Sequence, residues 1–109
     1  MTDKIVVLTT CDSEKQAEKL AHTLVDQLLA ACVNILPNVR SVYRWEGKIE
    51  DSAEWLLLIK SRRDLLTALR AEIQKVHTYE VPEVIAIPVV DGSEAYLNWL
   101  DGQLITPAE

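Results

Sequence analysis

Two amphipathic helical patterns that alternate with apolar, strand-like segments are the strongest constraint on the fold of this chain. Residues 13–29 and 62–76 carry Leu, Ile, Val and Ala at the three- and four-residue spacing of one helix face. Around them lie runs rich in apolar and β-branched residues, at 5–8, 32–45, 49–60 and 83–90. This β-α-β-β-α-β order predicts an α+β, ferredoxin-like sandwich with both helices on one face of an antiparallel sheet.

Residues typical of turns, bulges and helix caps refine this prediction. The second and third strands form a long hairpin that turns at Glu46-Gly47-Lys48, where Gly47 can adopt a positive φ. Pro37 predicts a bend or bulge, because proline donates no ladder hydrogen bond. Ser93 is expected to cap a short C-terminal helix, and the tail at 106–109 is expected to fray.

Size and charge restrict the classes of protein to consider. The chain has 109 residues and a net charge of −6, which fits a single domain over 1–109 and disfavours nucleic acid as a partner. Its apolar runs are shorter than the ~20 residues of a membrane span. The two cysteines, Cys11 and Cys32, lack disulfide-framework or metal-motif spacing. With no visible signal peptide, we expect a cytoplasmic protein with reduced thiols.

The strands are more apolar than a monomeric sandwich requires. Helices on one face leave the other face of the sheet uncovered, and monomers rarely expose so large an apolar surface. We therefore expect homo-oligomerisation through the sheet. Tyr43, Trp45 and Trp55 on the hairpin are interpreted as packing across that interface. The alternative, a stacking platform for bases, is disfavoured by the acidic charge.

Five segments occur in a characteristic order: LAACVNILP at 29–37, SVYRWEGKI at 41–49, EWLLLIK at 54–60, HTYEVPE at 77–83 and YLNW at 96–99. Together they resemble the CutA divalent-cation-tolerance family over nearly the whole chain. The resemblance implies a compact homotrimer whose hairpins reach into neighbouring subunits, an architecture similar to PII-like signalling proteins. It also implies a role in tolerance of divalent cations, with copper as the metal usually considered.

The chain departs from the family pattern at two places. Thr78 stands where the family typically has a proline, which loosens the backbone beside His77. Thr9 stands where some members carry a cysteine, and Val76-His77 where they carry two consecutive histidines. Of the metal ligands seen in those relatives, only His77 remains.

His77 is the strongest candidate metal ligand, because imidazole suits Cu(II) and Zn(II). Glu80 and Glu83, together with Tyr79, could complete an oxygen-rich site for copper or another divalent cation. The alternative is structural: His77 caps the second helix and hydrogen-bonds the following loop.

The cysteines and the first helix supply further candidates. Cys11 is expected just before the helix N-terminus, where the dipole lowers the pKa of a thiol and favours copper binding; an ordinary loop cysteine is the alternative. Cys32 is interpreted as a small buried residue, with an interfacial role left open. Glu18, His22 and Asp26 are interpreted as ordinary surface charges at i, i+4 and i+8.

The sequence contains no nucleophile–base pattern and no phosphate-binding glycine loop, so we expect no enzymatic activity. The leading hypothesis is a trimeric divalent-cation-tolerance protein that binds copper-type ions weakly. Two alternatives remain, a PII-like sensor that binds a small molecule between subunits and a structural or scaffold trimer.

Overall fold

The computed structural model describes residues 1–106, so the fraying expected for 107–109 lies outside the described residues. The elements are β1 (Lys4–Cys11), α1 (Glu14–Asp26), β2 (Cys32–Trp45), β3 (Lys48–Arg62), a 3-10 turn η1 (Arg63–Leu65), α2 (Leu66–Val76), β4 (Ile85–Pro88) and α3 (Glu94–Gly102). The strands form one antiparallel sheet in the order β2-β3-β1-β4. This order confirms the predicted ferredoxin-like fold.

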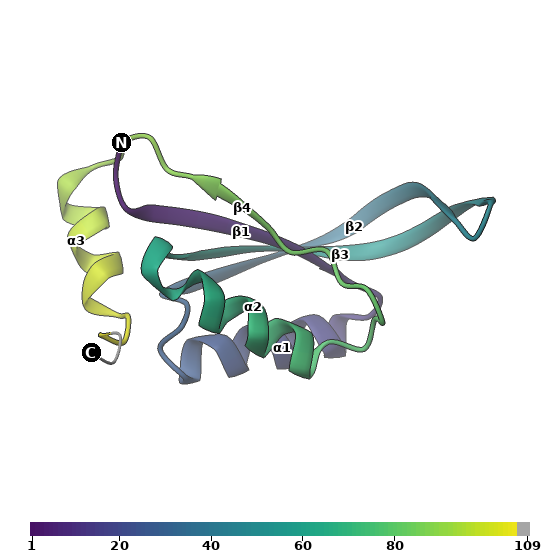
Figure 1. The fold of residues 1–109 in the computed structure, drawn as a ribbon, viewed down its shortest axis with the longest axis horizontal. Coiled ribbons are helices and arrows are strands. Elements are labelled where there is room, and N and C mark those ends of the chain that lie inside the picture. The colour runs from purple at the N-terminus through teal and green to yellow at the C-terminus, as the bar shows by residue number, and fades with distance from the viewer. Residues whose placement is uncertain (107–109) are drawn as a thin grey trace.

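The core lies between the sheet and the two longer helices. Figure 1 shows α1 and α2 on the same face of the sheet, with α3 near the end where the chain begins. In β1 the side chains of Ile5, Val7, Thr9 and Cys11 are buried, as the two-residue period of a strand requires. They pack with α1 and β3 residues that have no exposed surface, including Leu20, Leu24, Leu57 and Ile59.

Several element boundaries differ from the prediction; strands β1 and β3, for example, extend beyond the predicted 5–8 and 49–60. Helix α1 ends at Asp26 because Leu28 adopts a left-handed φ of 60°, and the N–H groups of the next two residues bond back to the Leu24 carbonyl. The predicted second helix begins instead with the 3-10 turn η1, and Arg62 belongs to β3. Strand β4 is shorter than the predicted 83–90 segment.

The β2–β3 hairpin projects well beyond the helices (Figure 1). Its register shifts between Leu36 and Val39, which confirms the disruption predicted at Pro37. The turn has two residues, Glu46 at φ 49° and Gly47 at φ 79°. Positive φ at both positions matches the right-handed twist of the flanking strands, so the hairpin can stay paired to its tip.

The sheet face away from α1 and α2 has no helix over it (Figure 1). Leu8 pairs there with Leu58 on one side and with Ile85 on the other. Ile85 is 50% exposed and Ile87 45% exposed. We call this surface the open face; its apolar members are Val6, Leu8, Leu36, Leu56, Leu58, Ile85 and Ile87.

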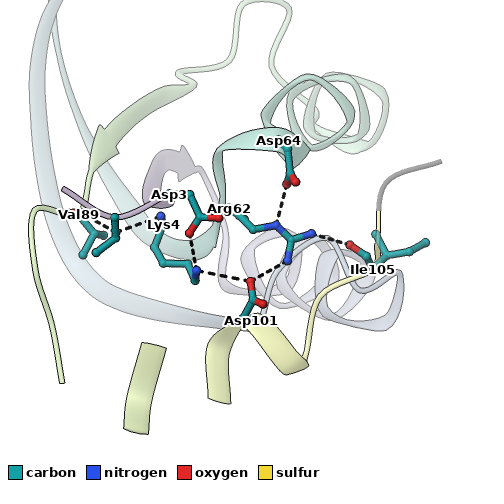
Figure 2. Close-up of polar contacts among 8 residues, drawn as sticks. Asp3, Lys4, Arg62, Asp64, Val89, Asp101 and Ile105 are labelled. Carbon is teal, nitrogen blue, oxygen red and sulfur yellow. Dashed lines mark hydrogen bonds and ion pairs between the residues drawn. The ribbon is translucent and has the colours of Figure 1, made fainter. Parts of the chain in front are cut away.

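A polar network attaches α3 to the end of the sheet (Figure 2). The buried Arg62 guanidinium donates from Nε to Asp64, from Nη1 to Asp101 and from Nη2 to the Ile105 carbonyl, at 2.8, 2.8 and 2.9 Å. The Lys4 ammonium lies 3.4 Å from the same Asp101 carboxylate. The bond from Arg62, with the charge of Lys4, holds the pKa of Asp101 below its usual range. Sheet and α3 are therefore joined by charge as well as by packing.

None of the helices within residues 1–106 is long and apolar enough to cross a membrane.

Candidate functional site

His77 joins the end of β1 to the loop that follows α2. It is the C-cap residue of α2 and 8% exposed. Its Nε2–H donates to the Thr10 carbonyl at 2.7 Å, and its Nδ1 accepts from the Tyr79 backbone N–H at 3.0 Å. A carbonyl only accepts and an amide N–H only donates, so the two bonds select the neutral ring with its proton on Nε2. This is the structural role that the sequence offered as the alternative.

Cys11 is the last residue of β1 and is fully buried in the core. Its Sγ lies 3.8 Å from His77 Nε2. Burial, reinforced by the charges of Asp12 and Glu54, raises the pKa of the thiol to about 11. The predicted lowering of this pKa is therefore wrong. The helix N-terminus does not set the thiol's environment, because the side chain points into the core, and Ser13 caps α1 by accepting from the Gln16 N–H at 3.1 Å.

Tyr79 and Glu54 form a second polar pair close to this one. The Tyr79 hydroxyl donates to Glu54 Oε2 at 2.5 Å, and its ring centroid lies 4.6 Å from that of His77. Burial and this bond raise the pKa of Tyr79. Glu54 is 6% exposed in β3, and it is not among the site residues predicted from the sequence. In the sequence it is merely the polar residue that precedes an apolar run.

A groove of about 560 Å³ opens beside the Glu54–Tyr79 pair, between the hairpin and the loop after α2. This volume lies in the usual range for small-molecule sites. We call it the hairpin groove; its lining residues are Thr10, Ser41, Val42, Tyr43, Trp45, Glu54, Tyr79, Glu80, Val81 and Glu83. The lining contains three carboxylates and three aromatic rings, and none of these residues is Lys, Arg or His.

The four predicted metal ligands fall into two places. Cys11 and His77 meet in the interior, whereas Glu80 and Glu83 line the hairpin groove. Within residues 1–106, no group of three or more His, Cys, Asp and Glu side chains is arranged to hold a metal ion. Thr9, where some relatives carry a cysteine, is fully buried, and its hydroxyl has no partner in the described part of the chain.

The remaining candidates lie apart from these two places. Trp55 lines a separate hollow with α1 residues and Pro37, away from Tyr43 and Trp45. Cys32 is only partly buried, and its Sγ lies 4.0 Å from Lys60 Nζ. The predicted surface charges on α1 are confirmed as exposed: Glu18, His22 and Asp26.

The environment of Cys11 predicts that its thiol reacts slowly with alkylating reagents. At pH 8 a thiol of pKa about 11 has a thiolate population more than about a hundredfold below that of an ordinary cysteine. Iodoacetamide should therefore label Cys11 at least that much more slowly in the folded protein than in guanidinium, as followed by peptide mass spectrometry. Labelling at equal rates in the folded and unfolded states would contradict the buried position.

Comparison with known proteins identifies the family. The CutA1 divalent ion tolerance model matches residues 5–103. The divalent-cation tolerance protein CutA of Thermus thermophilus is 43% identical over 95 residues, which cover 87% of this chain and 92% of that protein. Protein CutA, chloroplastic, of Arabidopsis thaliana is 49% identical over 96 residues, 88% of this chain.

This chain spans about half the length of the plant and mammalian relatives, 53% of the Arabidopsis thaliana protein and 51% of the Mus musculus one. Among solved structures, CutA1 from Oryza sativa matches with a TM-score of 0.93 and 44% identity, over 95% of each chain. CutA from Xylella fastidiosa matches with a TM-score of 0.93 and 38% identity, over 95% of this chain and all of that one. The chain belongs to the CutA1 divalent ion tolerance family.

Proposed function

We propose that this protein acts in divalent-cation tolerance as a homotrimer that binds copper-type ions weakly, without catalysis. The observation that carries the metal binding is the 3.8 Å separation of Cys11 Sγ and His77 Nε2. Thiolate and imidazole are the side chains that best suit copper and zinc.

The separation of the two atoms fits a shared ion. Zinc binds sulfur at about 2.3 Å and nitrogen at about 2.0–2.1 Å, so two such ligands at a tetrahedral angle lie about 3.6 Å apart. Cys11 and His77 are therefore close to ligand spacing without movement of the backbone. Further ligands would have to come from water, from backbone carbonyls such as that of Thr10, or from rearranged side chains.

The affinity is weak because metal binding removes a proton from Cys11 and breaks hydrogen bonds of His77. The Cys11 thiol has to lose its proton despite a pKa raised to about 11. Metal binding at His77 Nε2 moves the ring proton to Nδ1, which breaks both the bond to Thr10 and the bond from Tyr79. Metal affinity should consequently rise with pH, by about tenfold per unit for the thiol proton released.

The homotrimer is supported by the open face, where exposed Ile85 and Ile87 continue a row of partly buried apolar residues. The non-catalytic assignment is supported by the high pKa of Cys11 and by the engaged ring of His77. A cytoplasmic location is supported by the two free cysteines, which suit a reducing compartment. The names of some relatives specify other compartments: the Arabidopsis thaliana protein is called chloroplastic and the Archaeoglobus fulgidus one periplasmic.

Titration calorimetry of the reduced, EDTA-treated protein with Zn(II), and with Cu(II) under anaerobic conditions, tests the metal site. The chain offers matched controls, since it has two histidines and two cysteines. We expect Cys11→Ser and His77→Gln to abolish the binding heat, and Cys32→Ser and His22→Gln to leave it unchanged. Thermal melts of the four variants establish that each is folded.

Two results would refute the metal assignment. The first is wild-type heat in a folded Cys11→Ser variant. The second is loss of heat on removal of His22, which is exposed on α1. Either result would mean that the ion does not bind at the Cys11–His77 pair.

A further inference from the structure

We propose that Tyr79, anchored by Glu54, is a positioning residue that holds the ring of His77 in the tautomer that cannot bind metal. An ion then binds the Cys11–His77 pair only when the backbone of Tyr79 moves away from the ring. This inference rests on the proposed function and identifies what controls that site.

The first argument is the tautomer of His77. In a neutral imidazole one ring nitrogen carries the proton, and the other carries the lone pair that can bind a metal. The bonds to the Thr10 carbonyl and from the Tyr79 N–H place the proton on Nε2. Nε2 is also the atom that lies 3.8 Å from Cys11 Sγ. The ring therefore presents an N–H group, and not a lone pair, on the side where the proposed ion binds.

The second argument concerns the two backbone groups that bond the ring. When the ring proton moves to Nδ1, the Thr10 carbonyl loses its donor, but its oxygen can still face a cation favourably. The Tyr79 N–H cannot adapt in this way, because an amide N–H only donates. Its nitrogen lies 3.0 Å from His77 Nδ1, so two N–H groups would face each other across this distance. Unpaired donors in a partly buried place are costly, and metal binding therefore requires the Tyr79 backbone to move.

The third argument is that Tyr79 is held at both ends. Its hydroxyl donates to Glu54 Oε2 at 2.5 Å, while its backbone N–H donates to His77. Glu54 belongs to β3 and is 6% exposed, so this acceptor is fixed within the sheet. Hydrogen bonds to a carboxylate are roughly twice as strong as those between neutral groups. The bond to Glu54 therefore opposes displacement of Tyr79 from the ring.

The loop around Tyr79 is held by few other contacts. Residues 78–84 contain no helix or strand, although Val84 packs against the core. Among residues 78–84, no hydrogen bond other than the two of Tyr79 reaches the remainder of the described chain. Release of Tyr79 therefore frees the loop, and an ion at the interior pair changes the position of this segment.

Calorimetry of Tyr79→Phe with Zn(II) tests this control, because the change removes the hydroxyl and keeps the ring. We expect the assembled, reduced variant to bind about three- to tenfold more tightly than the wild type, since the ion no longer has to break the bond to Glu54. A merely structural role of Tyr79 would give weaker or unchanged binding. Tyr96→Phe, the same change at an exposed residue of α3, should bind as the wild type does.

Two variants of Glu54 separate the hydrogen bond from the charge. Glu54→Gln removes the charge and keeps an oxygen that accepts from the Tyr79 hydroxyl, whereas Glu54→Leu removes both. Because both variants lack the charge, a difference between them measures the anchor alone. Glu54→Leu should bind Zn(II) about three- to tenfold more tightly than Glu54→Gln. This comparison also decides the question if Tyr79→Phe has a lowered melting temperature.

Hydrogen exchange tests the anchor without metal. In buffer containing EDTA, the amide of residue 79 should exchange about tenfold faster in Tyr79→Phe than in the wild type, as measured by nuclear magnetic resonance. Tyr96→Phe should leave this rate unchanged. Addition of Zn(II) to the wild type, after removal of EDTA, should accelerate exchange of the same amide.

The outcomes distinguish this proposal from the metal assignment on which it rests. If Cys11→Ser abolishes the wild-type heat, but neither Tyr79→Phe nor Glu54→Leu binds Zn(II) more tightly than its comparator, the metal site stands and the control by Tyr79 is overturned. Equal exchange of the residue-79 amide in the wild type and Tyr79→Phe would overturn it without any metal. Heat that Cys11→Ser leaves unchanged would refute the metal site, and the control by Tyr79 would fail with it.

Discussion

Replacing Ile85 and Ile87 with glutamate should convert the proposed homotrimer into monomers. Both side chains lie on β4 at the open face, where they are 50% and 45% exposed in the single subunit. The substitutions therefore cost the isolated fold little. In an assembly that covers this face, two carboxylates per subunit would have to be buried without partners, at several kcal/mol each.

Light scattering after size-exclusion chromatography measures the effect directly. We expect the mass to fall from three times 12.3 kDa to 12.3 kDa. The matched control is Val25→Glu, which adds a charge at another exposed apolar residue, 41% exposed on α1. This control should remain trimeric. A double variant that retains the wild-type mass would show that the open face is not the interface.

The sequence predicted the arrangement of strands and helices because the periods of the apolar residues are long and regular. Boundaries were harder, since they depend on single backbone angles. The left-handed Leu28 ends α1 although apolar residues continue in the helical period to Leu29. Leucine has no strong preference for that conformation, so nothing in its type signals the end of the helix.

The environment of Cys11 was mispredicted for a related reason. Its position before the helix suggested a dipole effect, but the alternation of buried side chains in β1 extends through Thr9 to Cys11. The strand period, and not the helix N-terminus, fixes the direction of the thiol. Following the alternation past Leu8, where the predicted strand stopped, would have placed the thiol in the core.

The hairpin groove could not be predicted from any one segment. Ile35 packs against the core on the helix side of the sheet, whereas Tyr43 and Trp45, also at odd positions, line the groove. The register shift between Leu36 and Val39 accounts for this change of face. The groove also needs the loop after α2, which His77 holds against the end of β1.

Arg62→Met should lower the free energy of unfolding of the subunit by about 2–3 kcal/mol. The guanidinium, with a side chain 10% exposed, donates to two carboxylates and to the Ile105 carbonyl. Asp64 and Asp101 are each 52% exposed. In the variant, water can therefore hydrogen-bond the two carboxylates in place of the guanidinium. The loss of stability is for this reason smaller than that for an unpaired buried charge.

Urea unfolding at pH 7 measures this loss, and hydrogen exchange should show it concentrated in α3, which the network attaches to the sheet. Arg63→Met is the matched control. This neighbouring arginine is exposed, and its guanidinium contacts the Met1 sulfur at 3.9 Å, so its replacement should change the free energy of unfolding by less than about 0.5 kcal/mol. Equal losses in the two variants would show that the network does not hold α3.

The acid dependence of the Arg62→Met effect separates charge from packing. Because Arg62 lowers the pKa of Asp101 in the folded state, the ionised carboxylate stabilises the wild type above the ordinary Asp pKa of about 3.9. That contribution disappears as the pH falls through the lowered pKa of the folded state. The difference in unfolding free energy between wild type and Arg62→Met should therefore shrink below about pH 4. A difference that stays constant down to pH 2 would mean that Arg62 stabilises α3 through its bond to the uncharged Ile105 carbonyl, and not through the Asp101 carboxylate.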